Sequence, residues 1–239
     1  MLRLRPLLAL PVLLALGAFA RPDYIVAAFS NMSAGATITG WETMSLGDAP
    51  RTDYALVTDG GTSVVRARAN RSASGLIRRV RVDPNRSPVL TWRWKVDGVI
   101  AKGDVRKKSG DDYPARIYIT FDKDVSELSL GDRVKYRALR ALGYDDIPVR
   151  ALNYIWANKA SEGQIVSNPY TDWVKMIPVE SGAGNAGTWR VETRDVVRDY
   201  KAAFGEDPPA INGIAIMSDA DNTKGTATAY YGDMRMRAR

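Results

Sequence analysis

Strict alternation between apolar and polar residues is the clearest pattern in this chain. In the segment Val89–Val96 the apolar positions include Trp92 and Trp94, and polar residues stand between them. The segment Ala115–Phe121 repeats the pattern, with Arg116 on its polar side. Because successive side chains of a strand point to opposite faces, a period of two predicts half-buried strands of an antiparallel sheet.

Shorter segments of the same kind, separated by turn residues, predict further strands. They are Tyr54–Thr58, Thr62–Ala69, Leu76–Val82, Leu152–Ala157, Val174–Val179, Thr188–Glu192, Ile211–Met217 and Thr226–Met236. Many short strands favour a sandwich or a barrel, and we expect an all-β fold, an antiparallel β-sandwich with one continuous core. The residues expected in this core are Leu90, Trp92, Trp94, Ile117, Ile119, Ile214 and Ile216.

Two segments have the spacing of short helices. In Arg194–Phe204 the apolar residues recur at helical intervals, and Gly205 then ends the helix. The segment Asp132–Leu142 places apolar residues on one face and arginines off it. This second helix is expected to be a surface insertion between strands.

The first twenty residues have the layout of a cleavable signal peptide. Arg3 and Arg5 precede an uncharged apolar run at positions 6–19, which is too short for a bilayer crossing of about 20 residues. Ala18 and Ala20 are the small residues that signal peptidase requires. We expect residues 1–20 to be removed and the protein to be periplasmic or secreted, with no stable membrane span after cleavage. A retained membrane anchor is the alternative.

Residues 21–239 are expected to form a single β-sandwich domain, because no linker or repeat divides them. The net charge of the whole chain is +7, and two of its arginines belong to the leader. This mild basicity suits a sheet face attracted to anionic envelope polymers. Export argues against nucleic acid as a partner, although Arg78, Arg79 and Arg81 form a basic cluster.

The chain contains no cysteine and no histidine. Disulfide scaffolds, thiol nucleophiles, zinc sites built on imidazole and Ser-His-Asp triads are therefore excluded. Any enzymatic proton transfer would have to use Asp, Glu, Lys or Tyr.

Two acidic segments are candidate sites. In the first, Asp111 and Asp112 lead into an apolar strand that presents Arg116. Neighbouring carboxylates there can bind a hard cation, or one can have its pKa raised and act as a general acid. The alternative is a solvated turn in which an aspartate pairs with Arg116. We expect these three residues to lie at one end of the sandwich, close to the second segment.

The second segment runs from Ser218 to Gly225 between two strands and contains the oxygen-bearing side chains of Asp219, Asp221, Asn222 and Thr223. It is similar to half of a calcium loop, and a calcium site at Asp219 and Asp221 is the one cofactor that the sequence leaves open. The full EF-hand pattern fails, because a lysine and a tyrosine replace its glycine and glutamate. A polar hairpin turn is the alternative.

Aromatic residues supply a third candidate. Flat aromatic faces flanked by hydrogen-bonding groups are the usual platform for a sugar ring, and Tyr154 and Trp156 are candidates for such a face. Trp92 and Trp94 also qualify chemically, but their alternation with apolar residues places them in the core.

Five strings in this order resemble an exported bacterial family of unknown function, domain of unknown function 3047. They are Leu90–Lys95, Gly110–Arg116, Asn153–Ala157, Asp199–Tyr200 with Phe204–Gly205, and Ile214–Thr223. The resemblance covers roughly residues 40–236 and implies no activity. At the position of Lys224 the resemblance leads us to expect a glycine, which would make a tighter turn. The stretch Ala229–Met234 is similar to the closing strand of galactose-binding-like jelly rolls, which implies a fold and not a function.

Three functions follow as hypotheses. The first is a non-catalytic periplasmic accessory module that binds a glycan or another envelope polymer. The second is a carboxylate-dependent glycan hydrolase or lyase in which Asp111 or Asp112 works with Asp219 or Asp221, which requires carboxylates roughly 5–10 Å apart across one cleft. The third is a protein-interaction or assembly domain, which would expose an apolar patch and lack a polar groove.

Overall fold

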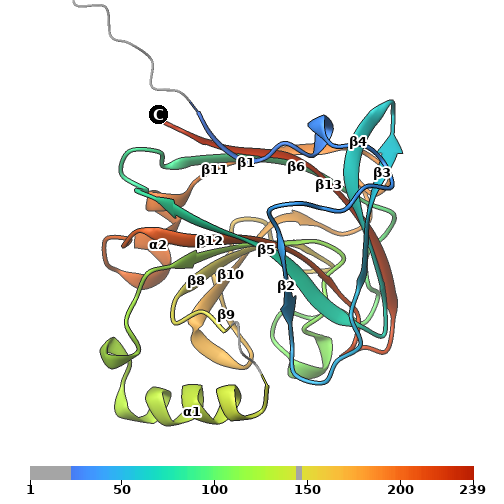
Figure 1. Cartoon of the computed structure of the whole chain (residues 1–239). Helices are drawn as coiled ribbons and strands as arrows, with labels where there is room; N and C mark the ends of the chain where they lie inside the picture. The colour runs from blue at the N-terminus through green and yellow to red at the C-terminus, as the bar shows by residue number, and fades with distance from the viewer. Residues whose placement is uncertain (1–22, 144–146) are drawn as a thin grey trace, which may run out of the picture.

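The computed structural model describes residues 23–143 and 147–239 and shows two packed β-sheets (Figure 1). The expected signal peptide, residues 1–20, lies outside the described residues. Within the described part of the chain, no helix has the length and apolar character needed to cross a membrane.

One sheet has six strands and the other has seven. The six-stranded sheet has the order β11-β6-β13-β4-β3, with β1 added at β13, and the seven-stranded sheet has the order β2-β5-β12-β7-β8-β10-β9. The strands of the first sheet are β1 (Tyr24–Ala27), β3 (Asp53–Asp59), β4 (Thr62–Asn70), β6 (Val89–Val96), β11 (Arg190–Asp195) and β13 (Thr226–Arg237). Those of the second are β2 (Glu42–Ser45), β5 (Ala73–Val82), β7 (Arg116–Phe121), β8 (Ala151–Ala157), β9 (Val166–Asn168), β10 (Thr171–Ser181) and β12 (Ile211–Asp219).

From β3 to β7, and again from β11 to β13, the chain crosses from one sheet to the other, apart from the β3–β4 hairpin. This is the arrangement of a jelly roll, and the expected all-β sandwich is confirmed. One detail differs from a purely antiparallel sandwich, because β8 and β10 pair in parallel with Val174 opposite Ala151.

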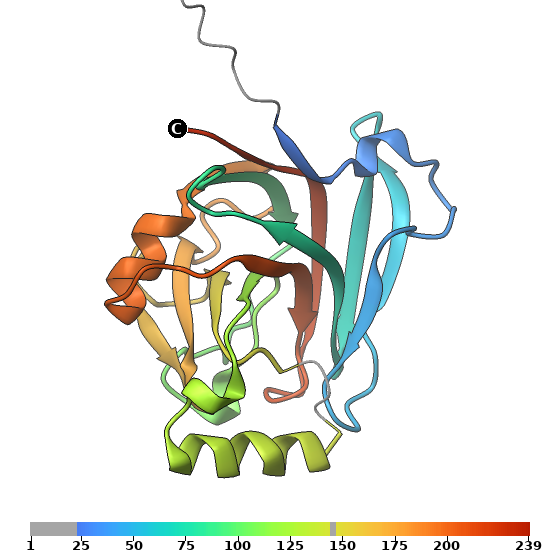
Figure 2. The ribbon, with the colours of Figure 1, turned by 60° about the vertical axis from the view of Figure 1, so that its left-hand side comes forward.

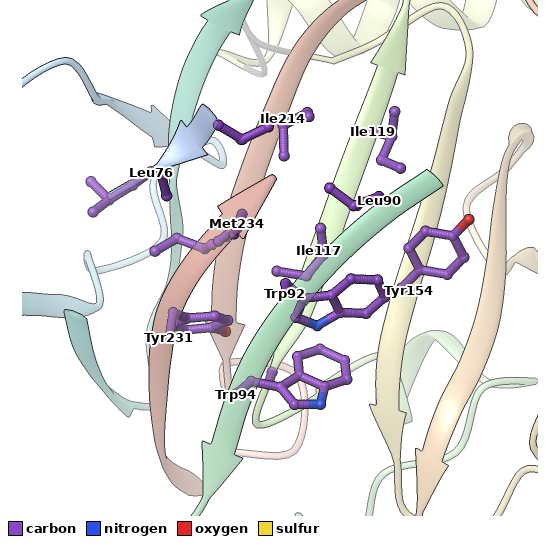
Figure 3. Packing of buried hydrophobic residues seen from close by; sticks show 14 of the residues in the cluster. Leu76, Leu90, Trp92, Trp94, Ile117, Ile119, Tyr154, Ile214, Tyr231 and Met234 are labelled. Atoms are coloured by element: carbon purple, nitrogen blue, oxygen red, sulfur yellow. The ribbon is translucent and has the colours of Figure 1, made fainter. Parts of the chain in front are cut away.

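The core between the sheets contains the residues that alternation places there. All seven residues predicted for the core are at most 1% exposed and belong to one cluster. Trp92 stacks on Tyr154 from the opposite sheet, with ring centres 5.3 Å apart, and meets Trp94 edge to face (Figure 3). Aromatic burial of this size contributes much of the stability of a sandwich core.

The two helices are α1 (Leu130–Ala141) and α2 (Val196–Phe204). Helix α2 begins two residues later than predicted because Asp195 is its N-cap, its carboxylate accepting from Arg198 N, and Arg194 belongs to β11. It ends at Gly205, whose φ of 72° is favourable for glycine. Helix α1 begins at Leu130 because Ser129 caps it.

Helix α1 is inserted between β7 and β8, as predicted, and lies along one edge of the molecule outside both sheets (Figure 2). Its inner side packs through Tyr136 and Leu139 on a small cluster that includes Trp173 and Val174. A second small cluster, around Met44 and Met217, covers another part of the outer face of the seven-stranded sheet.

Candidate functional site

Arg116 is the centre of a buried polar cluster at the start of β7. Alternation sends Ile117 and Ile119 into the core and turns Arg116 to the outer face of the seven-stranded sheet. Its guanidinium donates from Nε to Oδ1 of Asp219 at 2.8 Å and from Nη2 to Oδ2 of the same carboxylate. The Arg116 side chain is only 2% exposed, so this paired geometry is what makes its burial tolerable.

The guanidinium of Arg116 makes two further hydrogen bonds. Nη2 donates to the backbone carbonyl of Asp111 at 2.6 Å, and Nη1 donates to the hydroxyl of Tyr118 at 3.1 Å. The guanidinium lies 4.2 Å from the centre of the Tyr113 ring. Arg116 therefore fixes two aromatic rings and the backbone that enters β7.

Asp112 holds the loop that follows β12. Its Oδ1 accepts from the backbone N–H of Asn222 at 3.1 Å, and its Oδ2 accepts from the backbone N–H of Thr223 at 2.6 Å. In the same loop Lys224 adopts a φ of 56°, a conformation that glycine takes more easily. The two acidic segments thus lie side by side at one end of the sandwich, which is the arrangement that the sequence predicts.

Asp111 is the carboxylate of this cluster whose bonding is incomplete. Its Oδ2 accepts from Nδ2 of Asn168 at 3.1 Å, but its buried Oδ1 has no hydrogen-bond partner among the described residues. The nearest cation, Nη2 of Arg116, is 3.6 Å from Oδ1. Burial raises the pKa of Asp111 above its usual range, and the charge of Arg116 opposes the shift.

Three carboxylates of the cluster are close enough to be considered as metal ligands. One oxygen each of Asp112, Asp219 and Asp221 lies within 4.8 Å of the other two. The oxygens of Asp112 and Asp219 already accept N–H groups, and Asp219 also accepts from the backbone N–H of Tyr113 at 3.1 Å. A calcium ion needs six to eight oxygen ligands, so it would have to displace these donors.

The cluster forms one end of a hollow of about 480 Å³ on the outer face of the seven-stranded sheet. This volume lies within the usual range for small-molecule sites. Its polar lining residues include Asp48, Asp111, Arg116, Tyr118, Thr120, Asn168, Tyr170, Thr171, Asp219, Asp221 and Asn222. Its apolar lining residues are Met44, Leu46, Ala49, Leu139, Leu142, Ile147, Pro148, Val174 and Met217.

Tyr118 and Tyr170 add phenol groups to the polar end. The hydroxyl of Tyr170 donates to Oδ1 of Asn222 at 2.9 Å, which ties the turn between β9 and β10 to the loop after β12. Burial raises the pKa of Tyr118 to about 12, so this hydroxyl stays protonated. Burial, with Asp112 nearby, also raises the pKa of Asp221. The polar end of the hollow therefore contains both hydrogen-bond donors and acceptors, and burial favours the neutral forms of Tyr118 and Asp221.

The sequence-predicted ligand residues of the two acidic segments fall into two groups. Those that line the hollow are Asp111, Arg116, Asp219, Asp221 and Asn222. Asp112 and Thr223 lie behind them and shape the loop.

The sequence-based prediction that Tyr154 and Trp156 form a platform for a sugar ring is wrong. Both are fully buried, and their polar atoms are bonded internally, Tyr154 to Asp199 at 2.7 Å and Trp156 to the carbonyl of Gly182 at 3.0 Å. They face inward between the sheets, so neither ring offers a surface to a sugar.

Sequence reasoning missed Tyr118, Asn168 and Tyr170 as lining residues. Tyr118 is at the second position of the polar side of β7 and could have been found from the alternation that identified Arg116. Asn168 is the last residue of β9 and Tyr170 lies in the short turn before β10, so neither carries such a periodic signal.

The fold and this site define a class of protein: a jelly-roll β-sandwich with a ligand-sized hollow on the outer face of one sheet. Residues 39–235 match the family described as "Protein of unknown function (DUF3047)", and the chain belongs to that family. No curated protein matches the sequence significantly.

Several solved structures are similar to this chain at a distant level. The K1 cleaved adhesin domain of Lys-gingipain from Porphyromonas gingivalis W83 has 12% identity and a TM-score of 0.38, covering 92% of this chain and 99% of that one. The family 30 carbohydrate-binding module of a cellulosomal cellulase from Clostridium thermocellum has 12% identity and a TM-score of 0.37, with the same coverage of 92% and 99%. The cellulose induced protein Cip1 has 12% identity and a TM-score of 0.39, covering 86% and 94%.

Proposed function

We propose that this protein is an exported, non-catalytic module that binds an envelope glycan in the hollow described above. The observation that carries the proposal is that Oδ1 of the buried Asp111 has no hydrogen-bond partner among the described residues, in a hollow whose lining also includes Asn168 and Asn222. Carboxylates and amides at close quarters are groups that bond to the paired hydroxyls of sugars, and the rings of Tyr118 and Tyr170 suit the C–H face of a pyranose.

Binding is favoured over hydrolysis by the way the four acidic side chains are used. Asp112 holds the loop and Asp219 pairs with Arg116, so both are committed to the fold. Asp111 and Asp221 remain, and the pKa of each is raised by burial. A hydrolytic pair needs environments that push two pKa values apart, with one group protonated and the other ionised.

The cellular location is part of the proposal. A glycan of the cell envelope is accessible to this protein only if the protein leaves the cytoplasm, which the leader at residues 1–20 would provide. Periplasmic or secreted localisation is therefore what the proposed ligand requires.

The test is a thermal-shift screen of the purified protein against envelope oligosaccharides, followed by calorimetric titration of any that bind. Asp111→Asn should reduce affinity at least about tenfold, because it alters a buried group that bonds to the ligand. Asn168→Ala should reduce affinity in the same direction. The matched control is Asp207→Asn, a carboxylate whose side chain is 77% exposed outside the hollow. The proposal fails if no oligosaccharide binds or if Asp111→Asn binds as tightly as the native protein.

A further inference from the structure

Helix α1 has apolar residues on the side that faces solvent as well as on the side that packs. Leu130 is 78% exposed and Val134 is 67% exposed, and Ala138 continues the same face at an interval of four. Leu142, at the C-cap, is 67% exposed but lines the hollow and is not part of this face. Exposed apolar residues aligned along one helix face differ from isolated ones, which are common on protein surfaces.

Helix α1 packs on the rest of the fold through a different face from this stripe. Tyr136 and Leu139 already contact the cluster around Trp173, with the Tyr136 and Trp173 ring centres 6.3 Å apart. The helix is thus anchored on one side, while Leu130, Val134 and Ala138, which follow one another at intervals of four residues, are all exposed.

Cations flank the exposed stripe. Arg133, Lys135 and Arg137 are on α1, and no ion pair joins any of them to a carboxylate of the described residues. Lys135 lies over the ring of Trp173, with its Nζ 5.5 Å from the ring centre. Arg133 instead donates to the backbone carbonyls of Leu128 and Ser126. The one acidic residue of α1, Asp132, accepts from the hydroxyl of the N-cap residue Ser129.

We propose that the outer face of α1 binds an anionic lipid surface. A helix whose apolar stripe lies beside cations that no carboxylate neutralises is suited to the plane of a membrane interface, where the stripe enters the headgroup boundary and the cations meet lipid phosphates. A protein partner is less well matched, because hot spots of protein interfaces are enriched in aromatic residues and the exposed stripe has none. The contact is peripheral and goes beyond the glycan site.

Sedimentation with lipid vesicles tests the proposal on the intact purified protein. Vesicles of phosphatidylcholine mixed with phosphatidylglycerol should retain the protein, and vesicles of phosphatidylcholine alone should retain much less. Binding should weaken as salt is raised from about 0.1 M to about 1 M, since screening shortens the range of the attraction.

Two substitutions and two matched controls identify the surface. Val134→Ser should lower the partition coefficient several-fold, and Arg137→Gln should lower it about fivefold, the loss expected for one cation near an anionic surface. The controls are Val191→Ser, at an equally exposed valine on β11 that is 68% exposed, and Arg68→Gln, at an exposed arginine on β4. Both controls should bind like the native protein, and circular dichroism should show all four variants folded.

Three results would overturn the proposal. The first is the absence of binding to phosphatidylglycerol vesicles, and the second is an equal loss in the control variants. The third is concentration-dependent self-association, measured by light scattering, that Val134→Ser abolishes, because the stripe would then be an interface between two copies of the chain.

Discussion

Arg116 and Asp219 are 103 positions apart in the sequence, and their side chains join neighbouring strands by two hydrogen bonds in a buried setting. The pair fixes the end of β12 against the start of β7, where the two acidic segments meet. A buried charge without its partner is strongly destabilising, because desolvation is no longer balanced.

Replacing Arg116 should therefore reveal the structural role of the pair. Arg116→Ala should lower the free energy of unfolding by about 3–5 kcal/mol, as measured by urea denaturation. The control is Arg106→Ala, since Arg106 pairs with Asp104 at the surface with its own side chain 76% exposed, and this variant should be nearly neutral. The double variant Arg116→Met with Asp219→Leu should recover part of the loss. If Arg116→Ala alone is neutral, the pair is not what holds this end of the sandwich.

Calcium is expected to leave the stability unchanged. The carboxylates of Asp112 and Asp219 are occupied by N–H donors, so Arg116 supplies the compensating charge that a cation would otherwise provide. Thermal unfolding with and without calcium should give the same Tm, both in the native protein and in Asp221→Ala. A rise in Tm with calcium that Asp221→Ala removes would show that the cluster is a metal site.

Glu192 should make stability depend on pH. Burial and the nearby Glu180 raise the pKa of Glu192 from 4.5 to about 7. The folded state then holds this proton more tightly than the unfolded state, so the contribution is complete below pH 4.5 and is lost as pH rises through about 7. As pH rises from about 5 to about 8, the Tm of Glu192→Gln should fall less than the Tm of the native protein. The exposed Glu162→Gln serves as control, and an unchanged pH profile in Glu192→Gln would contradict the assignment.

Export should leave a defined N-terminus. Signal peptidase cleavage after Ala20 would make Arg21 the first residue of the mature protein. Intact-mass measurement of protein recovered from outside the cytoplasm should show the loss of residues 1–20. Protein that retains Met1 there would support the membrane-anchor alternative.

Alternation of apolar and polar residues was sufficient to predict the strands that have one face in the core and the other face directed outward. Strand β6 has the bounds that the pattern indicates, because its tryptophans face the core and Arg93 and Lys95 face outward. The four-residue strands β1 and β2 and the three-residue strand β9 were not predicted, since alternation cannot be recognised in segments so short.

The polar half of the site could be predicted and the apolar half could not. Asp111, Arg116 and Asp219 carry chemistry that the sequence displays at strand ends. The apolar wall is made by residues such as Met44 and Leu139, which come from distant segments and meet only in three dimensions. A usable signal existed in β12, whose apolar run without alternation indicates burial on both faces and hence a covered outer surface.

The positions of β12 and β13 also determine when this chain can fold. Each is an interior strand of its sheet, β12 between β5 and β7 and β13 between β4 and β6, although both follow all the other described strands in the sequence. A nascent chain that ends before Ile211 leaves the facing edges of β5 and β7 without a partner, and unpaired edges favour aggregation. Pairings between such distant segments also slow folding. Both sheets must therefore wait until β12 and β13 have been synthesised, and loss of either strand should be more damaging than the small number of lost residues suggests.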